Sequence, residues 1–338
     1  MPRVHIQLVS WNGEKYIPYL FESLRAQKFT DWELFVLDNG SADKTFGLIS
    51  EESKKLSQPT QLIQKVKNIG FAPGHNELFR AALKTDAEYI LLLNQDMCLD
   101  ASFLEKLVFF CDAHPDVGAA SGRLMKWAFP QKTEIIDSLG LKTFRSHRVI
   151  DMDGGHTWDE EDDVDALEVF GVSGALPLYR TEALREVAYE GEIFDEDFFS
   201  YKEDVDLAWR LKLAGWFAFT VLDAFAYHDR SASGPKNLSD KAARENRKFK
   251  SKLANFYSYR NHICMLIKNF HPVSFWGEIL PTAWYECKKV VYLTFVDPRV
   301  VVQSWREIRR LMPRMKQKRA FIAAHTTVSP TQMAHWFE

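Results

Sequence analysis

Several features are missing from this 338-residue sequence, and each absence argues against a class of protein. It has no stretch of 18 uncharged apolar residues and no charged-then-apolar leader, so we expect neither a membrane span nor a signal peptide. Its four cysteines, Cys98, Cys111, Cys264 and Cys287, show no CxxC spacing. Scattered cysteines in a chain of this length indicate reduced thiols, no zinc finger and a cytoplasmic location.

Three common enzyme motifs are also missing. The first predicted strand, VHIQLVS at 4–10, is followed by SWNGEKY and not by the GxGxxG of dinucleotide-binding folds. The chain contains no GxxxxGK[ST] phosphate loop and no GxSxG nucleophile elbow. These absences argue against a Rossmann dehydrogenase, a P-loop enzyme and a serine-triad hydrolase.

Charge is distributed unevenly along the chain, although the net charge is only −3. This small negative total argues against a general nucleic-acid-binding protein. Acids are concentrated in DEEDDVDALE, whereas basic residues are concentrated at 241–252 and 299–319. The turn-rich SASGPKN at 231–237 separates these parts. We therefore predict a body at 1–235 and a helical, basic and aromatic C-terminal region at 236–338.

Short apolar runs alternate with helical patterns along the first hundred residues. We expect strands at 4–10, at 32–41 with its apolar part ending in Asp38, and at 87–96. Near-continuous apolar strands separated by helices are typical of a mostly parallel sheet with helices on both faces. The sequence therefore predicts an α/β fold.

The second half has a less regular pattern. The stretch 117–175 is weakly patterned and predicts mainly loops. A helix over 202–214 should end at Gly215, because glycine is the usual residue just past a helix C-terminus. The apolar run at 217–230 then predicts a strand that carries His228 near its end.

Polar residues follow three of the predicted strands, at 10–12, 38–41 and 94–96. Ligands of open α/β sheets bind at the carboxyl ends of strands. A carboxylate and a histidine there suit a Mg²⁺ or Mn²⁺ ion shared with a diphosphate, with Asp96 as the oxygen ligand and His228 as the nitrogen ligand. Alternatively, Asp96 is a turn residue and His228 has no role, so only their combination favours a metal site.

The segment FDEDFFSYKEDVDLAWRLKLAGW at 194–216 contains more acids than a helix start requires. Glu203 and Asp204 fall in the first predicted turn, where the positive end of the helix dipole favours carboxylates. This electrostatic role is one interpretation of the pair. The other is that Asp204 is a general base that takes a proton from an acceptor hydroxyl, which contributes about 10²–10⁴ in rate.

Six motifs together resemble family 2 glycosyltransferases. In chain order they are VSWNGEKYIPYLFESLRAQKFTDWELFVLDNGSADKT, NIGFAPGHN, LLLNQD, SGALPLYR, FDEDFFSYKEDVDLAWRLKLAGW and YHDRSAS. The resemblance covers about residues 3–270. It extends to the bacterial rhamnosyltransferase-like branch, in which FYSYRNHICMLIKN at 256–269 has a counterpart. It implies a GT-A fold with a nucleotide-binding part at about 1–100, an acceptor-binding part at about 101–235, and inverting chemistry.

The resemblance also implies roles for individual residues. The donor nucleotide and diphosphate would lie near Val9, Ser10, Asn12, Asp38, Asn68, His75, Asn94 and Gln95. Asp38 would accept a hydrogen bond from the base, which suits uracil or thymine. Asp96 and His228 would bind Mg²⁺ or Mn²⁺, and Asp204, beside Glu203, would be the catalytic base. Two of the three residues in NQD are amides, so Asp96 is the only anionic ligand of that motif.

The function implied by the resemblance is transfer of one sugar, with L-rhamnose from dTDP-rhamnose as the first candidate. The acceptor would be a glycan or a polyprenyl-linked glycan in cell-surface polysaccharide synthesis. A UDP-hexose donor and a catalytically silent scaffold that binds nucleotide or glycan are the alternatives. The basic, aromatic C-terminal region would contact the cytoplasmic face of the membrane or, alternatively, pair two subunits in a homodimer.

Overall fold

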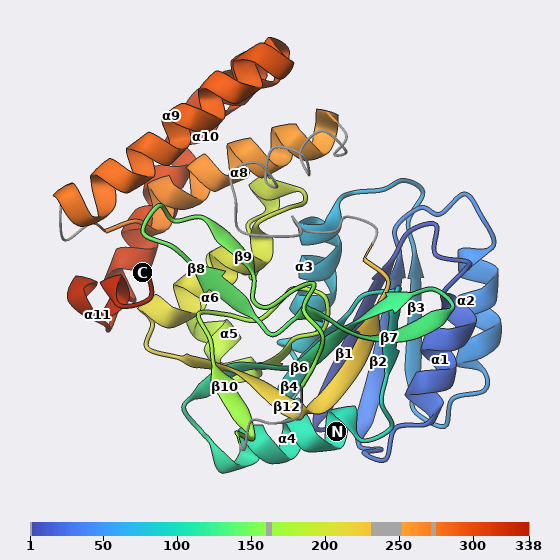
Figure 1. Ribbon diagram of the computed structural model, residues 1–338. Coiled ribbons are helices and arrows are strands. Elements are labelled where there is room, and N and C mark those ends of the chain that lie inside the picture. The colour runs from blue at the N-terminus through green and yellow to red at the C-terminus, as the bar shows by residue number, and fades with distance from the viewer. Residues whose placement is uncertain (1, 160–163, 231–251, 272–274, 338) are drawn as a thin grey trace.

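The computed structural model describes residues 2–159, 164–230, 252–271 and 275–337. In these parts a ten-stranded sheet has the order β10-β12-β6-β11-β4-β1-β2-β3, with β5 beside β12 and β7 beside β6 (Figure 1). Its strands are β1 Val4–Ser10, β2 Trp32–Asp38, β3 Thr60–Gln64, β4 Tyr89–Leu93, β5 Met97–Leu99, β6 Val117–Ala128, β7 Gln131–Ser138, β10 Ala166–Glu168, β11 Leu178–Arg180 and β12 Phe217–His228. A separate small sheet pairs β8 Leu141–Thr143 with β9 Val149–Asp151.

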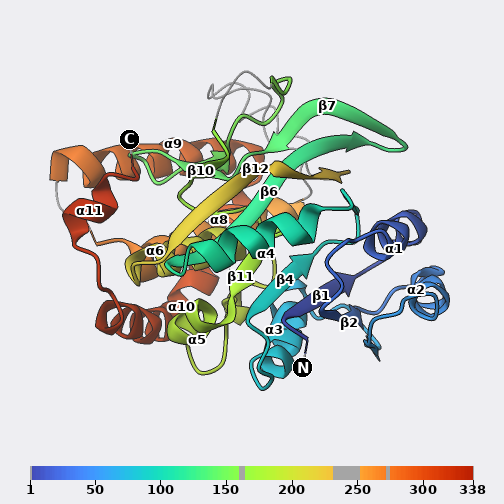
Figure 2. The same ribbon diagram turned by 90° about the horizontal axis from the view of Figure 1, so that it is seen from below.

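The first four strands pair in parallel, and β1, β2 and β4 are largely buried, as the sequence predicts. Helices cover both faces of the sheet, with α1, α2 and α4 on one face and α3, α5 and α6 on the other (Figure 2). These helices are α1 Ile17–Arg25, α2 Thr45–Ser53, α3 Phe71–Ala82, α4 Phe103–Ala113, α5 Thr181–Val187 and α6 Glu203–Leu213. Gly215, just beyond α6, has a φ of 94°, so the predicted helix end is confirmed.

The expectation of loops over 117–175 is wrong, because β6 is a twelve-residue strand that β7, β11 and β12 flank. The small residues of β6 interrupt the apolar pattern that marks a strand in the sequence. The folded chain requires small residues there because neighbouring atoms pack closely against the strand. A Cβ on Gly122 would lie 2.3 Å from the Ala224 carbonyl oxygen, and one on Gly118 would lie 2.8 Å from Trp216. The strand is therefore recognisable only with its neighbours in place.

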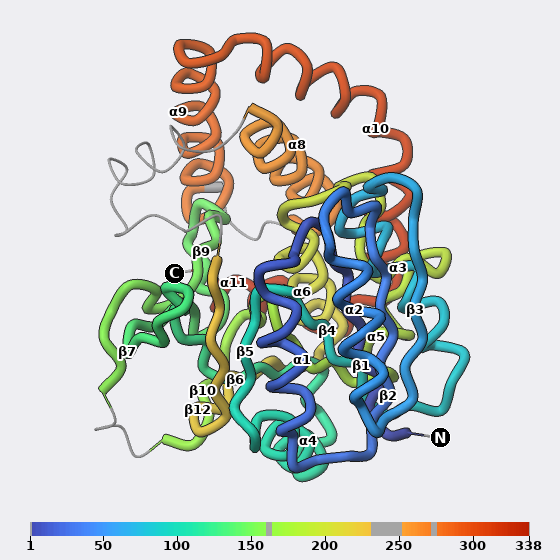
Figure 3. Tube along the Cα trace, turned by 90° about the vertical axis from the view of Figure 1, so that its right-hand side faces the viewer, coloured from blue at the N-terminus to red at the C-terminus, as the bar shows by residue number. Residues whose placement is uncertain are grey.

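The C-terminal region is helical, as predicted, and its helices lie together at one edge of the molecule (Figures 1 and 3). They are α8 Lys252–Asn269, the π-helix η2 Phe275–Ile279, α9 Leu280–Val296, α10 Pro298–Ala324 and α11 Pro330–Ala334. No helix in the described parts of the chain is both long and apolar enough to cross a bilayer. All four cysteines are free, and three of them are buried.

These helices are joined to the body through a shared core and buried ion pairs. Trp209 of α6 packs in one apolar cluster with residues of α8 and α10. Lys268 of α8 pairs with Asp206 of α6 at 2.9 Å, and Lys318 of α10 pairs with Asp195 at 2.6 Å. The predicted boundary between 235 and 236, the linker at 231–237 and nearly all of the basic run at 241–252 lie outside the described residues.

Candidate active site

The ends of β1 and β2 lie side by side and form one wall of the candidate site. Ser10 pairs with Asp38 in the parallel register, and both side chains are buried. Asp38 accepts hydrogen bonds from the backbone and the hydroxyl of Ser41. Asn12, at a φ of 50°, accepts from the backbone of Ala42 at 2.9 Å. The structure thus brings together three of the residues that the sequence assigns to the nucleotide.

The two predicted residues at 68 and 75 are placed differently from each other. Asn68 lies next to the end of β2, where its side-chain oxygen accepts from Asn39 Nδ2 at 3.2 Å and from the Gly70 backbone at 2.8 Å. His75 lies inside α3 and not in a loop, and its side chain is completely buried against Gln7 of β1. Burial lowers the pKa of His75 to about 3, so this side chain is a neutral core residue without an exposed surface.

Gln95 is fully engaged by the loop that follows β1. Its side-chain oxygen accepts from the Trp11 backbone nitrogen at 2.8 Å, and its side-chain nitrogen donates to the Trp11 carbonyl at 3.0 Å. Gly13 completes this contact, since a Cβ there would lie 2.3 Å from the Gln95 oxygen. The middle residue of NQD therefore orders the loop, which leaves Asp96 as the motif's carboxylate. Asn94 donates its backbone N–H to the Ala175 carbonyl at 3.0 Å.

Asp96 and His228 face each other, as the sequence predicts for a metal site. Asp96 Oδ1 lies 3.5 Å from His228 Nε2. Two neighbouring ligands that each lie about 2.1 Å from one cation are separated by about 3.0–3.5 Å, so the pair fits a shared divalent ion. Among the described residues, no group of three or more His, Cys, Asp or Glu is arranged to hold a metal. The remaining ligand positions would therefore fall to diphosphate oxygens and water.

Asp137 of β7 is a member of this cluster that the sequence did not reveal. Its carboxylate lies 2.9 Å from His228 Nδ1, so it accepts that proton and directs Nε2 toward Asp96. His228 is only 4% exposed. Burial lowers the pKa of His228, but Asp137 and Asp96 outweigh this effect and raise it to about 9. A cation between Asp96 and His228 would take the place of the proton on Nε2.

Several cations surround the cluster, and the sequence did not reveal these either. Arg230 pairs with Asp137 at 3.1 Å and also with Asp151 of β9. Burial lowers the pKa of Arg230, but the charges of Asp151, Asp137 and Asp204 raise it by more. The carboxylate of Asp204 therefore acts on the same side chain that pairs with the metal cluster. On the other side, Lys15 contacts Asp229 at 2.9 Å.

Glu203 and Asp204 begin α6, as predicted, but they occupy different environments. Asp204 is half-buried, and its oxygens accept from the backbone of Val205 at 2.8 Å and of Gly174 at 3.3 Å. Glu203 is buried, and one of its oxygens has no hydrogen-bond partner among the described residues. Burial and the nearby charge of Asp204 raise the pKa of Glu203 to about 8. Of the two, Asp204 is the more exposed carboxylate.

The backbone just before this pair is strained. Phe199, Tyr201 and Lys202 have φ values of 63°, 74° and 73°, in the left-handed region that non-glycine residues seldom adopt. Such strain persists only where the surrounding structure enforces it. The direction in which the chain enters α6, and so the position of Asp204, depends on whatever holds this segment.

Asn261 of α8 holds the strained segment. Its completely buried amide donates to the carbonyl oxygens of Phe198, Ser200 and Tyr201 at 3.0, 2.9 and 2.8 Å. The neighbouring Arg260 donates to the Phe198 carbonyl at 3.2 Å. These residues belong to the FYSYRN stretch, which the sequence offered only as a part of the resemblance. Nothing in its composition indicates that it supports residues about sixty positions earlier.

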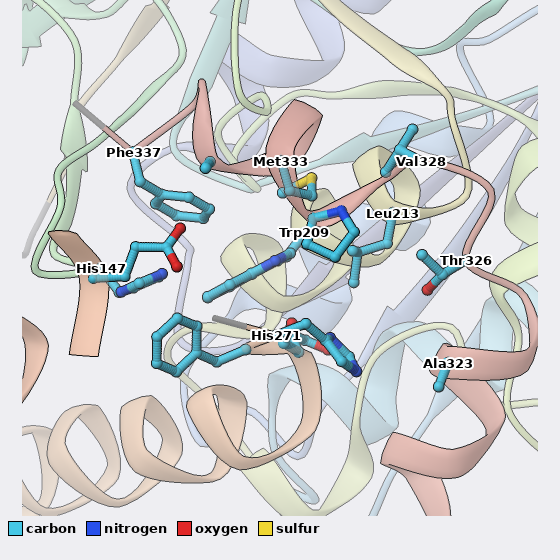
Figure 4. Close-up of a pocket in the computed structure, with 14 residues that line it drawn as sticks. His147, Trp209, Leu213, His271, Ala323, Thr326, Val328, Met333 and Phe337 are labelled. Atoms are coloured by element: carbon cyan, nitrogen blue, oxygen red, sulfur yellow. The ribbon is translucent and has the colours of Figure 1, made fainter. Parts of the chain in front are cut away.

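An apolar pocket of about 120 Å³ lies apart from this site, between α6 and the C-terminal helices (Figure 4). His147 stacks on Trp209 at one side of it, and Met333 and Phe337 line it as well. None of the residues assigned to donor, metal or base lines this pocket. The candidate active site is therefore the cluster at the strand ends and not this pocket.

Comparisons with known proteins show the family and the fold of the chain. Residues 6–187 match the family model described as "Glycosyl transferase family 2". An uncharacterized glycosyltransferase from Haemophilus influenzae is 26% identical over 123 residues, which are 36% of this chain and 37% of that protein. The poly(ribitol-phosphate) beta-N-acetylglucosaminyltransferase TarS from Staphylococcus aureus is 30% identical over 117 residues, which are 34% of this chain and 20% of TarS. The chain thus spans less than half the length of these curated relatives.

Two solved structures share the fold across most of the chain. The mannosyltransferase PcManGT from Pyrobaculum calidifontis, in complex with GDP-Man and Mn²⁺, has a TM-score of 0.54 at 15% identity and covers 96% of this chain and 86% of its own. TarS residues 1–349 with UDP have a TM-score of 0.50 at 17% identity and cover 96% of this chain and 88% of their own. These likenesses confirm the predicted fold class. Because the family model spans more than half of the sequence, this protein belongs to glycosyl transferase family 2.

Proposed function

We propose that the protein is an inverting glycosyltransferase that moves one sugar from a nucleotide-diphospho-sugar to a hydroxyl of a glycan or lipid-linked glycan. The observation that carries this proposal is the facing pair Asp96 and His228, 3.5 Å apart, together with a backbone link from the NQD motif to Asp204. Asn94 donates its backbone N–H to Ala175, and the preceding residue, Gly174, donates to the Asp204 carboxylate. One region thus contains a place for a cation with a diphosphate and a carboxylate for the acceptor. Inverting transfer needs both on opposite sides of the sugar carbon.

Each residue of the site would have a separate role in the proposed transfer. Asp38 and Ser10, at the ends of β2 and β1, would hold the base, and Asn12 would order the loop around it. Asp96 and His228 would hold a Mg²⁺ or Mn²⁺ ion, which when bound neutralises charge on the departing diphosphate. Asp204 would accept the proton of the attacking hydroxyl as the new bond forms and the diphosphate leaves from the opposite face.

For the donor we keep dTDP-rhamnose as the first candidate and UDP-N-acetylglucosamine as the second. The first depends on the resemblance of the chain to the rhamnosyltransferase-like branch. The second is favoured by the similarity to TarS, a beta-N-acetylglucosaminyltransferase. Both fit Asp38 as the acceptor for the base, because uracil and thymine present the same N3–H. Asp38 is completely buried and bonded to Ser41, so the base would reach it only after Ser41 moves aside. The reaction would take place in the cytoplasm, at the inner face of the membrane.

A donor screen tests this function. The protein is incubated with dTDP- and UDP-sugars, with and without Mn²⁺, and release of the nucleoside diphosphate is measured. We expect one sugar to be used and its use to stop in EDTA and to return with Mg²⁺ or Mn²⁺. Full activity without metal would exclude the ligand role of Asp96. Binding of nucleotide without turnover of any donor would instead support the silent scaffold.

The change Asp204→Asn tests the base. It preserves shape and removes the proton acceptor, so transfer should fall by about 10²–10⁴. Nucleotide affinity, measured by calorimetry, should stay near that of the wild type. Asp116→Asn, a carboxylate far from α6 in the chain, is the matched control and should be silent. Persistent transfer in Asp204→Asn would show that another group is the base.

A further inference from the structure

The helix α9 has its polar face turned inward and its apolar face turned outward. Thr282 and Lys289 are buried, and Glu286 is largely covered between His262 and Lys289. On the opposite side Trp284 is 64% exposed and Phe295 is 87% exposed. A surface helix of a soluble protein normally has the reverse arrangement. The apolar side therefore needs a different explanation from core packing.

Six exposed residues of α9 and the preceding η2 recur every three or four positions and form one stripe. They are Leu280, Trp284, Cys287, Val291 and Phe295, with Trp276 of η2 one turn earlier. Spacings of three and four residues place side chains on the same helix face. At a rise of about 1.5 Å per residue the stripe runs for about 25 Å. We name these six residues the α9 stripe.

The exposed charged residues of α10, the helix that follows α9, are all basic. The segment 275–324 contains four acids, and none of them is exposed. Glu286, Asp297 and Glu307 pair with His262, Lys252 and Arg310, respectively. Basic residues of α10 are exposed and make no ion pair with any residue that the structure describes; they are Arg299, Arg306, Arg309 and Lys316. The outer surface of α9 and α10 is thus apolar and positively charged.

We propose that the α9 stripe, together with the exposed basic residues of α10, binds the surface of an anionic lipid bilayer. An interfacial helix inserts tryptophan, phenylalanine and leucine between headgroups, while nearby arginines attract anionic lipids. A second copy of the chain is a poorer match. A two-fold contact through this surface would bring the same positive residues together without exposed acids to oppose them. Figures 1 and 3 show α9 and the first part of α10 at one edge of the molecule.

The inner side of α9 lies toward the catalytic segment. Thr282 contacts His147 Nδ1 at 2.8 Å. Burial lowers the pKa of Lys202, and among smaller influences the charges of Asp204, Tyr285 and Lys289 act on it. A bilayer on the outer side of α9 would therefore lie one helix away from the base. The idea that the bilayer delivers a lipid-linked acceptor to the base rests on the proposed function. The binding of α9 to the bilayer does not.

Vesicle sedimentation of the full chain tests the proposal, with phosphatidylcholine vesicles and with vesicles that also contain phosphatidylglycerol. The wild type should bind the anionic vesicles and release them at high salt. The double change Trp284→Glu and Phe295→Glu should weaken binding by at least about tenfold. Arg306→Glu should weaken vesicle binding about fivefold or more. Each basic residue near the surface contributes about 1 kcal/mol, which corresponds to about fivefold in affinity.

Phe109→Glu is the matched control, because Phe109 is an equally exposed phenylalanine on a different helix, α4. It should bind vesicles as the wild type does. Equal binding by the wild type and the double variant would overturn the proposal. So would a wild-type dimer, seen by light scattering, that the double change dissociates without any vesicle binding. Donor hydrolysis in solution should be unchanged in the double variant, so a failed donor screen with intact vesicle binding would overturn only the proposed function.

Discussion

The proposed metal ligands Asp96 and His228 and the proposed base Asp204 are positioned in opposite ways. Asp96 and His228 follow strands of the central sheet, and pairing between β5 and β12 fixes their separation. Asp204 follows a strained turn that the sheet does not hold and that Asn261 of α8 supports from outside. The proposed donor end of the site is thus a property of the sheet, whereas the proposed acceptor end depends on the C-terminal helices. Changes in the two regions should therefore have separable effects.

The largest expected effect is a loss of metal affinity when the residues around the proposed ligands Asp96 and His228 are changed. Asp137→Asn removes the carboxylate that orients His228 and leaves both proposed ligands in place. Loss of such an outer partner typically reduces metal affinity about 10–100-fold. Mn²⁺ affinity, measured by electron paramagnetic resonance of free Mn²⁺, should fall accordingly. Asp153→Asn, an exposed carboxylate nearby, should not change it.

A smaller effect, a loss of kcat, should follow when the strained segment before Asp204 loses its support. Asn261→Ala removes three hydrogen bonds to the strained segment, so Asp204 would lose its fixed position and kcat should fall by about tenfold. Mn²⁺ and nucleotide affinities should be unaffected, since no strand end moves. Leu253→Ala, an exposed change on the same helix, serves as control. An equal loss of nucleotide affinity would contradict the separation of the two regions.

The smallest expected effect is a change in the pH dependence of folding stability when Glu203 is replaced. The pKa of Glu203 is raised to about 8 from an ordinary value of 4.5, so the folded state retains its proton over this range. The contribution of Glu203 to stability is full below pH 4.5 and is lost as the pH rises through about 8. Glu203→Gln, which has no such proton, should therefore exceed the wild type in stability by at least about 1 kcal/mol above pH 8. Urea unfolding at two pH values measures the difference.

The sequence predicted the parallel half of the fold well, because β1, β2 and β4 are continuous apolar runs whose burial needs no partner to be recognised. It also placed Asp96, His228, Asp38 and Asp204 at the ends of their elements. It missed β6, whose glycines have meaning only against Ala224 and Trp216. The strands that were predicted are recognisable from residues adjacent in the sequence, whereas β6 is recognisable only from its contacts with residues far away in the sequence.

The missed site residues have the same explanation. Asp137 is 91 residues from His228, and Asn261 is 60 residues from Tyr201. Neither lies in a local pattern that marks it as functional, and both act through one or more hydrogen bonds that exist only in the folded chain. His75 illustrates the reverse case. It stands in a recognisable motif, yet the fold buries it beneath β1.

The side chain of Gln95 has one further consequence. A carboxylate at this position could accept from the Trp11 nitrogen but would repel the Trp11 carbonyl, so only an amide can fasten both backbone groups. The low charge of NQD is then the result of a locked loop and not of a weakened site. If the proposed donor binds here, one anion in the motif instead of two would oppose its diphosphate less, and the nearby Lys15 and Arg230 would contribute more of its neutralisation.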